Sequence, residues 1–487
     1  MNYTFRFPEM TLGYAVLALP LYVAVVIARL VLFPEILSEA SVTALILPLM
    51  GGAVLVFIPA VSPVLGTVLL FLAGRSEFAP LWTGITDVFF LLILGFLSIM
   101  VRNLLFPSDK GRRVFINVHP VLIGVFLFSI LYGLQFITSQ HTAYGTEKVI
   151  RTSVFALILT VITAQVISRK DSRKQFAIMY LLAVGAMSGL AVALAIAEHG
   201  LLGIQRISPI GGGPITLGRF TGFAALICMA YYLRNGRKRS LLGLAWFMGI
   251  TLLNGSRGPL FALLLAVVVL LIPSLVAPSV RGRAWKLAAF LIASVVAFVA
   301  AFLLAVSAGA PFARRYVILF TSEGGGSSVS ARLDWILETR EMLERAPFWG
   351  SGVASWPILK GWASQSGYPH NIFSELLIEN GTFATAIFLM ILLTALVLAA
   401  RSLVLARDSS EYSDGAIGAG LLVFSLIGAQ VSGDLFDNRY IWISMGWLAA
   451  VNASQHYMNK RHGDVTSCLK QVNPDGGSRA LLQNNWG

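Results

Sequence analysis

Arg219, Arg257, Arg332 and His370 stand apart from the other ionisable residues of this sequence. Each lies at the edge of a long apolar stretch or on the apolar side of an amphipathic segment. Charges at a membrane edge are costly, so each of these residues invites a functional interpretation. Arginine supplies forked donors that fit phosphate, and a neutral imidazole can remove a proton from a hydroxyl group near neutral pH. The four residues therefore predict an anion-binding site with a general base beside it.

Arg219 and Arg257 are placed where a helix is expected to begin. Arg219 follows a glycine-rich stretch that ends at Pro214. An arginine in a first turn opposes the helix dipole, and an anion shared with the free N–H groups would remove that conflict. An interfacial arginine that reaches lipid headgroups is the alternative. Arg257 lies in the tight turn Ser256-Arg257-Gly258 between two apolar runs. Its position there indicates either a functional role or a chance feature of the topology.

Residues 330–345 have the pattern of an amphipathic helix that lies along a membrane surface. Arg332 and Arg340 fall on its apolar side, where an unpaired charge would be expensive. Glu344 lies on the same side and can pair with Arg340, but it is too far along the helix to reach Arg332. We therefore predict that Arg332 faces a buried anion, and we keep Arg340 as a secondary candidate.

His370 follows Pro369, where we expect a long helix to begin. The helix dipole disfavours an imidazolium at a helix start, so the ring would stay neutral and could act as a general base. A lone histidine is more often structural than catalytic, so this residue alone leaves both alternatives open. Asn371, the next residue, is a further secondary candidate.

The sequence around these residues offers no recognisable metal or nucleotide site. We find no Asp-x-Asp triplet, histidine cluster or cysteine pair beside them, and no Walker-type loop. Asp434 and Asp437 are the nearest candidates, and with Arg439 adjacent we interpret them first as caps and an ion pair. We therefore expect a reaction that needs no metal and no cofactor.

The elements that carry these residues are predicted to be membrane-spanning helices. The 487 residues are 57% hydrophobic and only 12% charged, about half the charged fraction of soluble domains, and the mean hydropathy is +0.78. Apolar stretches of about 20 residues can cross a hydrocarbon core of roughly 30 Å, and only helices do so with every backbone group satisfied. The composition predicts an all-α polytopic membrane protein.

The apolar runs set the expected number of spans. They lie near 11–30, 41–60, 62–74, 81–101, 115–138, 149–167, 176–197, 218–233, 241–254, 258–278, 287–307, 377–400, 415–432 and 441–457. The run at 62–74 is short and could be re-entrant. We expect about 12–14 transmembrane helices in a GT-C-like arrangement.

The net charge of +13 is distributed in short clusters in every second loop. These clusters are Arg102–Arg113, Arg169–Lys174, Arg234–Arg239, Arg281–Lys286, Arg401–Arg407 and Lys460–Arg461. The positive-inside rule places these loops and both termini in the cytoplasm. The loops near 139–148, 198–217, 254–257, 308–376 and 433–440 then face the other side, where all four candidate residues lie.

The chain divides into four segments. Residues 1–307 are predicted to form an N-terminal transmembrane bundle, 308–376 an outer loop with amphipathic helices and the catalytic segment, 377–457 the C-terminal transmembrane helices, and 458–487 a cytoplasmic, disordered tail. An outer loop of this length between two spans is uncommon and tends to be functional.

Several short motifs occur in order around the candidate residues. His370-Asn371 is followed after nine residues by Gly381; Ala331 to Trp335 opens the loop helix, Pro347 to Gly352 precedes the histidine, and Ser256-Arg257-Gly258 lies upstream. From roughly 210 to 450 this pattern resembles the O-antigen ligase and polysaccharide polymerase superfamily. Ala384 departs from it, because many members have a second glycine there; we attribute that glycine to helix packing.

The resemblance implies a bacterial inner-membrane glycosyltransferase that acts on the periplasmic side without metal or nucleotide, in exopolysaccharide or lipopolysaccharide biosynthesis. The donor would be an undecaprenyl-diphosphate-linked oligosaccharide. Arg219, Arg257 and Arg332 would hold the diphosphate, and His370 would activate the acceptor hydroxyl.

The acceptor is left open by the resemblance. It could be lipid A-core (a ligase), another lipid-linked glycan (a polymerase) or a protein serine (an oligosaccharyltransferase). We favour the polymerase, because nothing in the sequence suggests a protein-acceptor domain. Membrane lipids and other polysaccharide-assembly proteins are further expected partners, and nucleic acid is not, because no basic face with interleaved aromatic residues occurs.

A flippase for lipid-linked oligosaccharides is the competing class. It would need charges along a cavity through both leaflets and often has two related halves. Charges within the predicted spans are few, with Arg29 and Asp87 the main cases, and we find no internal repeat. A purely structural assembly partner would leave the outer arginines unexplained.

Overall fold

The computed structural model describes residues 58–59, 62–72, 92–93, 95–97, 119–139, 142–203, 207–208, 213–309, 313, 316–317, 327–362, 367–435 and 437–472. The span predicted at 11–30, most of those at 41–60 and 81–101, the basic cluster Arg102–Arg113, and the charges Arg29 and Asp87 lie outside these residues.

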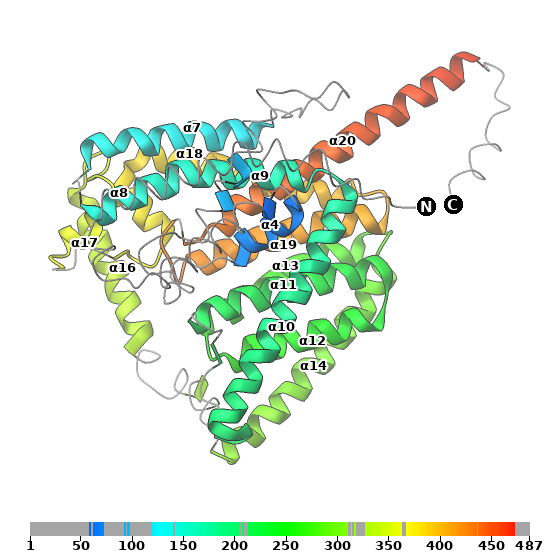
Figure 1. Cartoon of the computed structure of the whole chain (residues 1–487), viewed down its shortest axis with the longest axis horizontal. Coiled ribbons are helices and arrows are strands. Elements are labelled where there is room, and N and C mark those ends of the chain that lie inside the picture. The colour runs from blue at the N-terminus through cyan, green and yellow to red at the C-terminus, as the bar shows by residue number, and fades with distance from the viewer. Residues whose placement is uncertain are drawn as a thin grey trace, which may run out of the picture.

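The described residues form helices joined by short connections (Figure 1). They are α4 (Pro63–Leu72), α7 (Pro120–Leu134), α8 (Ala143–Ile150), α9 (Ala156–Val166), α10 (Lys170–Gly203), α11 (Pro214–Asn235), α12 (Lys238–Leu253), α13 (Arg257–Val276), α14 (Arg281–Ser307), α16 (Ser327–Arg345), α17 (Ser355–Leu359), α18 (Ile372–Val404), α19 (Ser409–Ala429) and α20 (Tyr440–Val472). A 3-10 turn at Gln135–Thr138 extends α7, and a π-helical turn at Arg151–Phe155 joins α8 to α9.

Eight of the helices in this part of the chain are long and apolar enough to cross a membrane. This confirms that the protein is an all-α polytopic membrane protein. Each apolar run predicted beyond residue 115 coincides with a helix. The run predicted to be short, at 62–74, is the ten-residue helix α4, which is shorter than a typical span.

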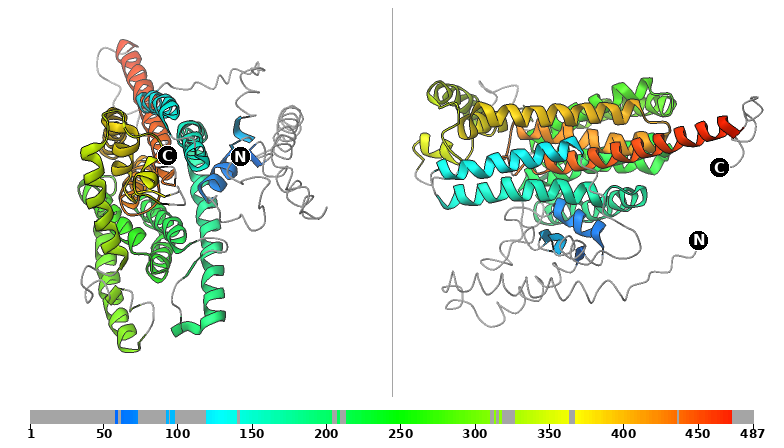
Figure 2. Two further views of the ribbon diagram at one scale, coloured as in Figure 1. Left: turned by 90° about the vertical axis from the view of Figure 1, so that its left-hand side faces the viewer. Right: turned by 90° about the horizontal axis from the view of Figure 1, so that it is seen from above.

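Helices α7 and α18 run side by side, whereas α10 and α14 are steeply inclined to them (Figure 1 and Figure 2). In both α11 and α19, 78% of the residues in the most apolar 18-residue stretch are buried, whereas in α14 only 6% of them are buried. A helix that is apolar all round yet exposed must face lipid, so α14 lies at the periphery and α11 and α19 form the interior.

The connections gather at two ends of the bundle. At one end Tyr144 Oη donates to the carbonyl of Gly367 at 3.2 Å, and Arg219 donates to the carbonyl of Ser432 at 2.9 Å. At the other end Arg173 pairs with Asp414 at 2.8 Å. Loops that the basic clusters assigned to opposite sides are therefore separated in the fold, and the candidate residues share one end.

The C-terminal helix is longer than we expected. The apolar run ends near residue 457, and we predicted a disordered tail from 458. Instead α20 continues through Val472 and projects beyond the neighbouring helices (Figure 1). Residues 458–472 are therefore helical in the structure, although Gly463 lies within this stretch.

Candidate functional site

His370 immediately precedes α18, and its backbone is left-handed with φ of 56°. The next residue, Asn371, is the N-cap: its Oδ1 accepts hydrogen bonds of 3.0 Å from the backbone N–H groups of Phe373 and Ser374. An asparagine cap satisfies donors that a helix start leaves free. The helix therefore begins at Ile372 and not at Pro369 as we expected, because the chain turns through His370 before it becomes helical.

The Asn371 side chain has a second contact that fixes the start of α18. Its Nδ2 donates to Gln430 Oε1 at 2.9 Å, and Gln430 Nε2 donates to the carbonyl of Leu426 at 3.1 Å. Asn371 thus caps one helix and ties it to the end of another, α19. We had kept Asn371 as a secondary candidate for chemistry. In the structure its side chain holds the start of α18 against the end of α19.

The His370 imidazole lies between two aromatic rings. It stacks on Trp335 of α16, with ring centroids 4.8 Å apart and planes inclined by 7°. Tyr368 meets it edge-on at 4.5 Å. Burial and, to a lesser degree, the charge of Arg332 lower the pKa of His370 from 6.5 to about 4. The imidazole is therefore neutral at neutral pH, which is the state a general base requires.

Arg332 and Arg257 lie close enough to influence each other. Burial lowers the pKa of the half-buried Arg332 guanidinium, and the positive charge of Arg257 lowers it further. Arg257 is the first residue of α13, so the positive end of that helix dipole adds to the local field. Two like charges beside a neutral imidazole form a site that favours an anion. The structure therefore brings together Arg257, Arg332 and His370.

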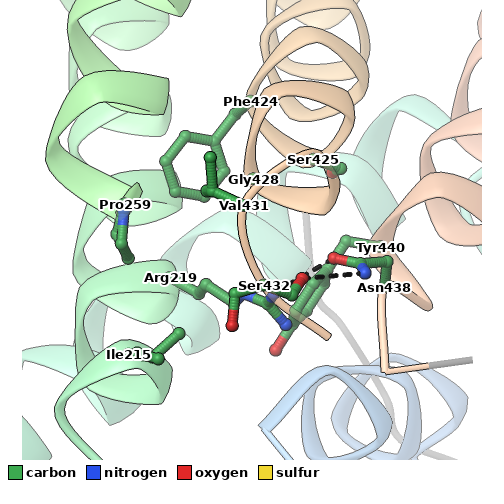
Figure 3. Close-up of a pocket in the computed structure, with 10 residues that line it drawn as sticks. All are labelled: Ile215, Arg219, Pro259, Phe424, Ser425, Gly428, Val431, Ser432, Asn438 and Tyr440. Carbon is green, nitrogen blue, oxygen red and sulfur yellow. Dashed lines mark hydrogen bonds between the residues drawn. The ribbon is translucent and has the colours of Figure 1, made fainter. Parts of the chain in front are cut away.

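Arg219 lies in the second turn of α11 and not in the first turn as we expected, and it binds protein groups in the loop that precedes α20 (Figure 3). Its guanidinium donates to the carbonyls of Ser432 at 2.9 Å and Asp437 at 3.2 Å and to Asn438 Oδ1 at 3.0 Å. The cavity beside it has room for about one water molecule. Arg219 thus holds the loop at 432–438, and most of its donors are used inside the protein.

Arg340 is separated from these residues along α16. Its side chain is exposed, as are the neighbouring apolar residues Ile336 (50%) and Leu337 (61%). We had expected this helix to lie along the membrane surface with Arg340 on its apolar side. Helix α16 packs through Trp335 and the buried Thr339, which leaves the apolar residues and Arg340 free of the protein core.

A buried cluster of charges lies beneath the start of α18, and the sequence did not point us to it. Lys148 Nζ lies 2.7 Å from Glu375 Oε1 and 2.6 Å from Glu379 Oε2, and all three side chains are at most 1% exposed. Glu375 Oε1 also accepts from the N–H of Leu435 at 3.3 Å. The signal was available: two acidic residues four apart share one face of a helix, and charges inside spans require partners.

Asp434 and Asp437, which we considered for a metal, form a local turn. Asp434 Oδ1 accepts from the backbone N–H of Asp437 at 2.7 Å, and its Oδ2 accepts from Tyr144 Oη at 3.3 Å. Asp434 therefore caps this turn, which is the first part of our interpretation of these residues as caps and an ion pair. Among the residues described, no group of three or more His, Cys, Asp or Glu side chains is arranged to hold a metal ion.

The glycines of the sequence motifs allow two backbone segments to touch. Gly381 interrupts α18 with φ of 78° and ψ of 179°, and the segment 347–352 packs against this kink. Ser351 N–H donates to the carbonyl of Ile378 at 2.7 Å, and Thr382 N–H donates to that of Phe348 at 3.0 Å. A Cβ atom at Gly381 or Gly350 would overlap the opposing backbone. The glycines therefore have a packing role in this motif.

The fold and this site define an all-α membrane protein with cationic groups and a neutral imidazole gathered at one end of its bundle. Residues 241–389 match the family described as O-antigen ligase. The segment that contains Arg257, Arg332, His370 and Gly381 is therefore similar to O-antigen ligases, which confirms the resemblance seen in the sequence. Arg219 lies outside the matched segment. No curated protein matches the chain.

Proposed function

We propose that the protein is a metal-independent membrane glycosyltransferase that transfers or polymerises glycan from an undecaprenyl-diphosphate-linked donor. The acceptor would be a glycan or a glycolipid on the periplasmic face of the bacterial inner membrane. The observation that carries the proposal is the grouping of Arg257, Arg332 and a neutral His370 within the segment that matches the O-antigen ligase family.

The arginines would act on the donor diphosphate. As the bond between the anomeric carbon and the phosphate oxygen breaks, the leaving diphosphate gains negative charge. Guanidinium groups fixed beside that charge stabilise the transition state where other enzymes use a metal ion. Arg257 and Arg332 are the main ligands in this proposal, because Arg219 uses most of its donors on the loop at 432–438.

His370 would act on the acceptor. Its neutral imidazole takes the proton of the acceptor hydroxyl while that oxygen attacks the anomeric carbon and undecaprenyl diphosphate leaves. Burial and, to a lesser degree, the charge of Arg332 lower the pKa of His370 in the free protein. A bound diphosphate would offset the charge of Arg332 and raise the pKa in part, so the histidine becomes a stronger base when the donor is in place.

Among acceptors we favour another lipid-linked glycan, and hence a polymerase, over lipid A-core or a protein serine. The alternative function is a flippase, which needs charges along a path through both leaflets. In the described part of the chain the buried ion pairs gather at the two ends of the bundle, Lys148 with Glu375 and Glu379 at one end and Arg173 with Asp414 at the other. This distribution favours transfer over transport.

The decisive experiment uses the purified protein with a defined lipid-linked repeat, with and without each candidate acceptor. Extended glycan and released undecaprenyl diphosphate from the donor alone would indicate a polymerase. Product only when lipid A-core is added would indicate a ligase. Movement of the donor across a vesicle bilayer without any new glycosidic bond would overturn the proposal in favour of a flippase.

A further inference from the structure

The His370 Nδ1 atom has no polar group among the described residues that would set the orientation of the ring. A base histidine is usually held by a third group that bonds the second ring nitrogen. Here Nδ1 is buried and has no hydrogen-bond partner among the described residues. The contacts that the ring does make are aromatic: the parallel face of Trp335 at 4.8 Å and the edge-on ring of Tyr368 at 4.5 Å. Stacking thus takes the place of the missing hydrogen bond.

Trp335 is itself fixed by other rings. Trp356 and Trp362 each meet it edge-on with centroids 6.3 Å apart, and they contact each other at 5.1 Å. Trp356 is fully buried, and its Nε1 donates to Thr339 Oγ1 of α16 at 3.4 Å. The Lys360 ammonium lies 5.6 Å from the Trp335 ring centroid. A ring held this way is a rigid support for its neighbour.

Trp335 and Arg332 are three residues apart on α16, so they lie on the same side of that helix. The same helix therefore presents a flat ring to His370 and a guanidinium next to it, and the charge of Arg332 reaches the imidazole. We propose that Trp335 is a positioning residue, which orients the His370 imidazole by stacking and fixes its place relative to the Arg332 guanidinium. This inference rests on the proposed function, in which His370 is the base.

A sugar-binding platform is the obvious different role for a tryptophan in such a site. The face of Trp335 that points to the site is covered by the imidazole at stacking distance, so a sugar ring cannot stack there without displacing the histidine. The geometry therefore favours support of His370 over direct contact with the glycan.

The test compares Trp335→Ala and Trp335→Phe with the parent in transfer assays across pH. Misplacement of a reacting group by about 1 Å can cost about 100-fold, so Trp335→Ala should lower kcat about 10- to 100-fold and change the donor KM little. Phenylalanine keeps a flat ring and should restore most of the rate. Trp349→Ala is the matched control, because Trp349 is in the same loop, is 68% exposed, and has ring contacts to Phe348 and Phe383.

The pH profile separates positioning from general damage. The profile of kcat/KM reports groups of the free enzyme, so in the parent activity should fall only as the pH drops towards about 4, where His370 gains its proton. In Trp335→Ala water reaches the ring, burial no longer opposes the imidazolium, and the acid limb should move up towards 6.5. An equal loss at every pH, with phenylalanine no better than alanine, would overturn the inference.

A second measurement needs no activity and no alanine variant. An imidazolium stacked on an indole should quench its emission, so the fluorescence difference between the parent and Trp335→Phe should titrate with acid, and His370→Gln should abolish that titration. If the fluorescence difference changes neither with acid nor in the His370→Gln variant, the stacking of His370 on Trp335 is contradicted. If His370→Ala transfers at the parent rate, the proposed function fails; if His370→Ala is inactive while Trp335→Ala is unimpaired, only the positioning role fails.

Discussion

At the scale of single residues, the proposed site separates into groups that bind charge and one group that transfers a proton. Arg257, Arg332 and His370 could be chosen from the sequence, because a charge or an imidazole at the edge of an apolar run needs an explanation. The residues that contact these side chains and Asn371 could not be identified from the sequence. Trp335 and Gln430 matter because of where α16 and α19 lie, and the sequence does not give distances between helices.

The two kinds of group should respond differently to substitution. His370→Ala should lower turnover by roughly 10²–10⁴, the usual contribution of general acid–base catalysis, with donor binding almost unchanged. Arg257→Ala and Arg332→Ala should weaken donor binding as well as turnover, because a charge-assisted contact is present in both the ground state and the transition state. Lysine should restore them only in part, because a point charge cannot reproduce the guanidinium fork.

Donor binding and single-turnover transfer, measured on each folded variant, check this division. Arg340→Ala is the matched control on the same helix as Arg332, because its side chain is exposed. Arginine variants that bind donor as tightly as the parent would contradict the diphosphate site. Transfer at the parent rate by His370→Ala would return the histidine to a structural role.

At the scale of elements, the apolar runs predicted the positions of the described helices. The ends and interruptions of the helices depend on individual side chains and were predicted less well. Asn371 starts α18 three residues later than Pro369 suggested, and polar residues carry α20 to Val472. The apolar residues of α16 are exposed, which fits the amphipathic surface helix that the sequence predicts. The packing of this helix through Trp335 could not be predicted, because it depends on where α16 meets His370.

The kink in α18 should tolerate no side chain. Gly381 combines φ of 78° with ψ of 179°, a region open essentially only to glycine and costing other residues about 1–3 kcal/mol. Its Cβ would also overlap the backbone of the segment 347–352. Gly381→Ala should therefore lower the free energy of unfolding by more than about 2 kcal/mol and reduce transfer.

Thermal melting in detergent measures this effect. Gly189→Ala is the control, because Gly189 lies inside α10 and has nothing within 4 Å of its would-be Cβ; it should melt like the parent. A Gly381→Ala protein that is as stable as the Gly189→Ala protein would show that the two backbone segments can separate without cost.

At the scale of the whole molecule, buried charges connect elements that are far apart in the chain. Lys148 of α8 joins Glu375 and Glu379 of α18, and Glu375 reaches the loop before α20. That loop also holds Arg219 of α11. Removal of one member of a buried ion pair costs about 3–5 kcal/mol, because the partner charge is left unpaired. Lys148→Met should therefore destabilise the fold by about that amount.

Removal of the charges together should be tolerated far better. The triple variant Lys148→Met, Glu375→Gln, Glu379→Gln leaves no buried ion and should recover most of the lost stability in the same melting assay. A triple variant as unstable as Lys148→Met alone would mean that the three side chains are needed for their shape and hydrogen bonds and not for their charge balance.

The orientation of the whole molecule decides whether the proposed site meets its donor. From the positive-inside rule we expect the basic loops in the cytoplasm and the loop at 308–376 in the periplasm. A cysteine introduced at Ser327 should react with an impermeant thiol reagent in cells permeabilised only at the outer membrane, whereas Cys468 should not. The second native cysteine, Cys228, is only 4% exposed within α11, so it should contribute little background, and a Cys468→Ser variant gives the baseline. Equal labelling at Ser327→Cys and Cys468 would overturn the predicted topology, and labelling of Cys468 alone would invert the orientation. An inverted orientation would also place Arg257, Arg332 and His370 on the cytoplasmic side, where a periplasmic glycan transfer could not use them.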